Sequence, residues 1–121
     1  MNNFGLSDEN LKQIIKTLKQ FDEIKEAIIF GSRAANKHKP GSDIDIALKG
    51  DIDSNLMYKL NSIFEESSLP YFFDIIDYNN INNPDLKFHI ENYGKTLFKI
   101  VKNGVSYHLI KKNVFIFNEI N

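Results

Sequence analysis

The chain has 121 residues, a length that predicts one domain and leaves no room for a separate substrate domain. Its formal net charge of −1 argues against direct nucleic-acid binding, which depends on a positive surface. It contains no cysteine, which excludes disulfides, thiolate nucleophiles and cysteine-based zinc sites. Neither a signal peptide nor a membrane-spanning apolar run is visible, so we expect a cytoplasmic protein with no membrane contact.

The first predicted element is an amphipathic helix that begins after Ser7 and ends near Phe21. Its apolar residues recur at helical spacing, at Leu11, Ile14, Ile15 and Leu18. A buried strand is expected at residues 27–30, where an apolar, β-branched run ends at Gly31. A Gly31-Ser32 turn and a short helical piece through residues 34 and 35 would follow.

A second strand is expected at residues 43–48, and two carboxylates stand at its start. Asp43 and Asp45 alternate with apolar residues, so both side chains share one face of the strand. Two ionised aspartates whose Cα atoms are about 6.6 Å apart repel each other and favour a bound cation. Hard oxygen ligands suit Mg²⁺, and two such ions roughly 3.5–4 Å apart can promote phosphoryl or nucleotidyl transfer. The Gly31-Ser32 turn would offer N–H groups and a hydroxyl to a phosphate.

The chain then alternates between helices and strands. A helix capped by Asp53 or Ser54 is expected to end near residues 67–68, with an apolar stripe made of Leu56, Leu60, Ile63 and Phe64. A third strand is expected at residues 71–77. Another helix should begin with Pro84 in its first position and end at Gly94, before a fourth strand at residues 95–101.

The third strand carries one carboxylate in an otherwise apolar run. Burying Asp74 there without a partner would cost several kcal/mol, so we expect it to be buried beside Asp43 and Asp45, with a bound metal. Asp77, at the end of the strand, is interpreted as a solvated or capping carboxylate.

The C-terminal residues leave two alternatives open. Asn103-Gly104 predicts a tight hairpin between residues 96–101 and 105–110. The apolar residues 114–117 could instead form a tail that docks a partner. We therefore divide the chain into a catalytic domain at residues 1–101 and a C-terminal extension at residues 102–121.

Together, the Gly31-Ser32 turn, the Asp43-x-Asp45 strand and the later Asp74 strand resemble the minimal nucleotidyltransferases. These are small members of the DNA polymerase β superfamily that occur as antitoxins or catalytic partners of HEPN-domain proteins. The resemblance covers roughly residues 8–100 and implies an α/β (α+β) fold, a small mixed sheet flanked by helices. It also implies transfer of AMP from ATP to a hydroxyl, which in the antitoxin branch is a tyrosine of the HEPN toxin.

The resemblance also implies a role for each matched residue. Gly31 and Ser32 would hold the triphosphate, and Arg33 and Ser42 would also bind the nucleotide. Asp43 and Asp45 would bridge two Mg²⁺ ions. Asp74 would bind the catalytic metal and help deprotonate the incoming hydroxyl.

The chain departs from the family pattern at two positions. Ala35 and Asn36 stand where a second basic residue and a glycine are usual. Asn36 can adopt the left-handed conformation of a glycine, and Lys37 or Lys39 could replace the basic contact. Two other functions therefore stay open: a non-catalytic antitoxin that neutralises its partner by binding, or the catalytic subunit of a two-chain small-molecule nucleotidyltransferase.

Overall fold

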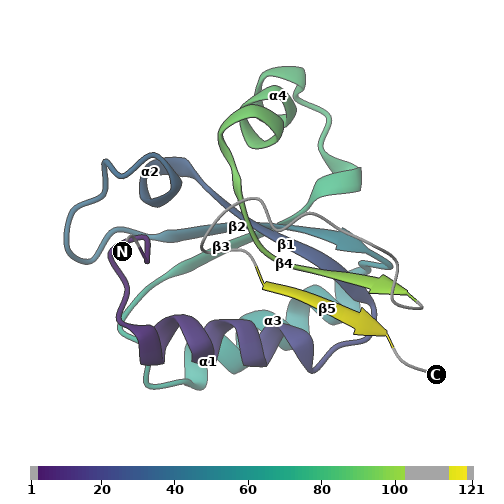
Figure 1. The fold of residues 1–121 in the computed structure, drawn as a ribbon, viewed down its shortest axis with the longest axis horizontal. Coiled ribbons are helices and arrows are strands. Elements are labelled where there is room, and N and C mark those ends of the chain that lie inside the picture. Colours follow the sequence, from purple (N-terminus) through teal and green to yellow (C-terminus); the bar gives the residue numbers. More distant parts are fainter. Residues whose placement is uncertain (1–2, 103–114, 120–121) are drawn as a thin grey trace.

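A five-stranded sheet with helices on both faces organises the chain in a computed structural model, which describes residues 3–102 and 115–119 (Figure 1). The strands are β1 (Ile24–Phe30), β2 (Ile44–Gly50), β3 (Phe73–Asp77), β4 (Lys95–Lys102) and β5 (Phe115–Glu119). The helices are α1 (Asp8–Lys19), α2 (Gly31–Ala34), α3 (Ser54–Glu66) and α4 (Pro84–Tyr93), with a 3₁₀ turn η1 (Tyr78–Asn80). The predicted mixed sheet flanked by helices is confirmed.

The sheet has the order β3-β2-β1-β4-β5 and combines both pairing directions. β1 pairs antiparallel with β2 and β4, whereas β2–β3 and β4–β5 are parallel. A parallel pair needs a crossover connection, and α3 supplies it between β2 and β3. In that pair Asp45 lies directly opposite Asp74.

Helices α1 and α3 cover one face of the sheet, and α2 and α4 lie on the other (Figure 1). The α1 cap is confirmed, because the Ser7 side chain accepts a hydrogen bond from the Asn10 N–H at 3.0 Å. Asp53 caps α3 in the same way, with 2.8 Å between its Oδ1 and the Leu56 nitrogen. The main core fills the space between the sheet and helices α1 and α3. A smaller core lies under α4 and contains Ile28, Phe30, Ala47, Tyr78 and Ile90.

Several predicted boundaries needed correction. Ile63 does not belong to the buried stripe of α3, since it is 37% exposed and lies at the margin of a face centred on Leu60. β1 begins three residues earlier than predicted, at Ile24, because the polar Lys25 and Glu26 interrupt the apolar run without interrupting the strand. β3 begins only at Phe73, and Phe72 before it is 81% exposed.

The second half of the chain follows the prediction more closely. Asn83 caps α4, Pro84 occupies the first turn and Gly94 ends the helix. β4 follows at once, as predicted.

The hairpin predicted at Asn103-Gly104 lies outside the described residues, so it and the docking role of the tail stay predictions. Residues 115–119 form β5, which pairs with β4. Across residues 3–102 and 115–119, no helix has the length and apolar character to cross a membrane.

Candidate active site

The turn between β1 and α2 lies directly against a carboxylate. Gly31 has a φ of +76°, a conformation that side chains other than glycine rarely adopt. A Cβ at this position would lie 2.3 Å from Oδ2 of Asp45. Glycine is therefore required twice, for the backbone angle and for the close approach of the carboxylate.

Asp45, which lies against this turn, has Asp74 opposite it in β3 and Asp43 two residues before it in sequence. Asp45 is half-buried in β2, Asp43 is exposed just before that strand, and Asp74 is exposed in β3 opposite Asp45. Partial burial, the charge of Asp74 and the charge of Asp43, in that order, raise the pKa of the Asp45 carboxyl. Asp45 is therefore close enough to both carboxylates to be repelled by them, whereas the joint metal-binding role of the three aspartates stays a prediction.

Asp74 differs from the sequence interpretation in one respect, because it is exposed. Its neighbour Phe73 points to the opposite face, where its ring stacks on Phe64 of α3 with centroids 4.1 Å apart. Asp74 thus faces outward from β3, which lies at the edge of the sheet. The apolar run alone did not indicate that this strand would be an edge strand. Asp77 is a capping carboxylate as predicted, since it accepts the Asn79 N–H at 3.1 Å.

The donor set of this site is compatible with Mg²⁺. Among the residues that the structure describes, no three acidic or histidine side chains form a ready-made metal cage. Mg²⁺ does not need one, because it binds through one or two carboxylates and completes its shell with water and substrate phosphates. The raised pKa of Asp45 marks a repulsion that a cation would relieve.

The loop after α2 closes in the expected way despite its departures from the family pattern. Asn36 has a φ of 58°, so it adopts the left-handed conformation predicted for it. The Lys37 N–H donates to the Ser32 carbonyl at 2.8 Å, which folds the loop back onto the turn. The Ser32 side chain is exposed and free to meet a ligand.

Arg33 and Ser42 hold this loop together. Arg33 is only 1% exposed, and its guanidinium donates to the carbonyl oxygens of Ser42 and Phe4. The Ser42 hydroxyl accepts the Lys39 N–H at 2.8 Å. These polar groups are occupied within the protein, and the nucleotide-binding roles assigned to Arg33 and Ser42 stay predictions.

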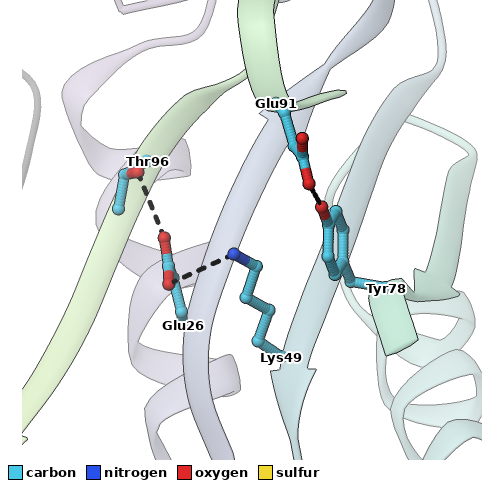
Figure 2. A network of polar contacts seen from close by, with 5 residues as sticks. All are labelled: Glu26, Lys49, Tyr78, Glu91 and Thr96. Atoms are coloured by element: carbon cyan, nitrogen blue, oxygen red, sulfur yellow. Dashed lines mark hydrogen bonds and ion pairs between the residues drawn. The ribbon is translucent and has the colours of Figure 1, made fainter. Parts of the chain in front are cut away.

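A second polar network links α4 to η1 and to strands β1, β2 and β4 (Figure 2). Tyr78 donates a hydrogen bond to Glu91 of α4, and the Lys49 ammonium lies 4.4 Å from the centre of the Tyr78 ring. Glu26 accepts from Thr96 at 3.4 Å and lies 4.0 Å from Lys49. The hydrogen bond to Glu91, together with burial, raises the pKa of Tyr78 to about 12. The sequence analysis missed this network because its members come from five separate elements.

A cavity of about 410 Å³ lies elsewhere, between α3 and the segment before β3. It is lined by Asn61, Phe64, Glu65, Leu69, Pro70, Tyr71, Phe72 and Phe73. None of the three aspartates lines it, so it is separate from the carboxylate site.

A glycine turn beside carboxylates on adjacent strands is suited to bind a phosphate group next to a divalent cation. The sequence profile described as "Polymerase beta, Nucleotidyltransferase" matches residues 12–103, and the chain belongs to this family. The chain is a nucleotidyltransferase, and the predicted family is confirmed. No curated protein was found to match the chain.

Solved structures of toxin–antitoxin complexes share the fold. A chain of a toxin–antitoxin crystal structure with AMP-PNP is 26% identical, with a TM-score of 0.61 over 72% of this chain and 71% of that one. The toxin–antitoxin MntA–HepT matches at 24% identity and a TM-score of 0.57, over 74% and 70% of the two chains. The tri-AMPylated Shewanella oneidensis HEPN toxin in complex with MNT antitoxin matches at 23% and 0.58, over 75% and 71%.

Proposed function

We propose that this nucleotidyltransferase moves AMP from ATP to a hydroxyl of a partner protein, most simply a tyrosine of a HEPN toxin that it neutralises. The observation that supports this proposal most strongly is that Asp45 lies against the Gly31 turn and opposite Asp74. A ligand bound at the turn would therefore lie beside Asp45. ATP as the nucleotide is supported by the 26% identical structure that holds AMP-PNP.

This mechanism assigns a role to the turn and to each of the three aspartates. The Gly31 turn and the exposed Ser32 hydroxyl would bind the triphosphate, and Asp43 and Asp45 would hold Mg²⁺. Mg²⁺ bound there would neutralise phosphate charge and orient the leaving group. Asp74 would accept the proton of the acceptor hydroxyl. The hydroxyl oxygen then bonds to the α-phosphorus, the bond from that phosphorus to the bridging oxygen breaks, and pyrophosphate leaves.

Exposure of the carboxylates favours a large acceptor. Asp43 and Asp74 are both exposed, so a residue on another protein's surface can reach them. The cavity beside α3 contains none of the aspartates and gives no enclosed place for a small acceptor near them. The net charge of −1 does not attract a polynucleotide.

The direct test is label transfer. Wild-type protein, ATP labelled on the α-phosphate, Mg²⁺ and a HEPN protein encoded beside it should yield AMP-labelled partner, and peptide mapping should place the label on tyrosine. Asp74→Asn should abolish transfer. Asp77→Asn is the matched control, because it changes a carboxylate of the same strand that only caps η1, and it should transfer normally.

The same experiment separates the alternatives. If wild type and Asp43→Ala neutralise the partner equally and no label moves, the protein acts by occlusion. Ala35, in place of a basic residue, gives that alternative its support. Labelling of a small hydroxylated acceptor, but not of the partner protein, would favour the two-chain small-molecule enzyme.

A further inference from the structure

We propose that Arg33 is a positioning residue that braces the active-site loop, residues 31–43, against a turn at residues 3–6, here called the N-terminal turn. The catalytic consequence of this brace rests on the function proposed above. The brace itself is a property of the free protein and is tested separately.

Arg33 joins segments that are distant in sequence. Its Nε and Nη2 donate to the Ser42 carbonyl at 3.1 and 2.9 Å, and its Nη1 donates to the Phe4 carbonyl at 2.7 Å. Its guanidinium carbon also lies 4.9 Å from the centre of the Tyr71 ring. A planar guanidinium can satisfy two carbonyls and an aromatic face at once, which a lysine ammonium cannot do in the same geometry.

Arg33 and two of its three contacts lie close in sequence to residues of the candidate site. Arg33 follows Ser32 directly, Ser42 precedes Asp43, and Tyr71 lies three residues before Asp74. One buried side chain therefore spans the phosphate turn, the start of the Asp43-x-Asp45 strand and the approach to the third carboxylate. Movement of Arg33 would change the distances among all three.

The N-terminal turn is fitted closely to the loop. Phe4 has a φ of 61°, an unusual conformation for a bulky residue, and its side chain is 2% exposed. Gly5 has a φ of +75°, and a Cβ there would lie 2.1 Å from Nε2 of His38 in the loop. Figure 1 shows the N-terminus beside the segment that follows α2. The turn precedes residues 12–103, so it lies outside the part of the chain that the family profile matches.

The first test measures amide hydrogen exchange in the free protein, without nucleotide or partner. In Arg33→Met and Arg33→Lys, exchange at residues 39–45 should rise at least tenfold, while exchange in α3 stays at the wild-type rate. Asp53→Ala is the matched control, because it removes the cap of α3 on the opposite face and should leave the loop protected. Unchanged exchange at residues 39–45 in Arg33→Met overturns the brace.

The second test measures kcat and KM for ATP in AMP transfer, from rates over a range of ATP concentrations. Positioning predicts that both Arg33 variants lose at least tenfold in kcat, and that Gly5→Ala, which cannot touch nucleotide, loses a comparable amount. Direct contact of Arg33 with phosphate predicts a raised KM for ATP, partial rescue by lysine and no effect of Gly5→Ala, and this pattern overturns positioning. If an Arg33 variant fails to fold, Gly5→Ala replaces it in both tests. Faster exchange at residues 39–45 and a lower kcat in Gly5→Ala support the brace, and no change in either overturns it. If wild type transfers no AMP, the proposed function fails, and exchange alone decides the brace.

Discussion

Replacement of Gly31 by alanine should separate the chemistry of the site from its stability. The new Cβ would lie 2.3 Å from Asp45 Oδ2, whereas ordinary contact begins at 3.4 Å. The carboxylate or the turn must therefore move by about 1 Å, a displacement that can cost roughly 10²-fold in rate when it affects reacting groups. The left-handed φ of +76° adds conformational strain to this displacement.

Gly41→Ala supplies the matched control for that strain. Gly41 has a φ of +85°, but nothing lies within 4 Å of the position of its Cβ. Both variants should lose about 1–2 kcal/mol from the left-handed conformation of alanine. At roughly 4 °C per kcal/mol for a chain of this size, each Tm should fall by about 4–8 °C.

The assay is label transfer to the partner at a temperature well below both melting points. Gly31→Ala should transfer AMP roughly 10²-fold more slowly than Gly41→Ala, although the two are similarly destabilised. Equal transfer by the two variants would refute the reasoning, because it would mean that the contact between the turn and Asp45 has no part in the reaction.

Three further predictions concern stability. Asp45→Asn should melt at or above the wild-type temperature at pH 7 without metal. Because the pKa of Asp45 is raised in the folded state, the folded wild type binds a proton before the unfolded chain does, and its free energy of unfolding should rise relative to that of the variant as the pH falls toward 3.8. The absence of this rise would argue against the repulsion. Mg²⁺-ATP at 100 times its Kd should add about 2.7 kcal/mol to wild type and nothing to Asp43→Ala, and a melting scan without any shift would contradict the site. Tyr78→Phe should lose about 1 kcal/mol at pH 8 in urea unfolding. Because the hydrogen bond to Glu91 needs the neutral phenol and the pKa of Tyr78 is about 12, this loss should shrink between pH 10 and 12, and a constant difference would exclude the role of that bond.

Local sequence signals predicted most of the fold. Helix starts need only nearby residues: Ser7 caps α1 as predicted, Asp53 is the one of the two expected candidates that caps α3, and Pro84 begins α4 as predicted. The contact between Gly31 and Asp45 follows from the antiparallel pairing of β1 with β2, two strands that are neighbours in sequence. The apolar run around Asp74 was enough to assign this residue to the candidate site. Its exposure could not be predicted, because exposure depends on which strand lies at the edge of the sheet.

The contacts of Arg33 could not be predicted in this way. An arginine after a glycine-serine pair indicates a phosphate ligand when only neighbouring residues are considered. Its carbonyl partner at Phe4 lies 29 residues away, and nothing in the local pattern predicts that the N-terminal turn returns to that position. The network shown in Figure 2 was missed for the same reason, because it forms only after five elements have packed.

The parallel pairing of β2 with β3 has a consequence for the order of folding. β1 and β2 are antiparallel and close in sequence, so they can pair early, whereas β3 must wait for the α3 crossover. Asp45 and Asp74 approach each other only in that later step, and their repulsion opposes it. A one-residue slip would relieve the repulsion but would turn Asp74 toward the core beside Phe64. A cation that bound these carboxylates during folding would speed the docking of β3 and favour the correct register, and would thus assist folding as well as the proposed reaction.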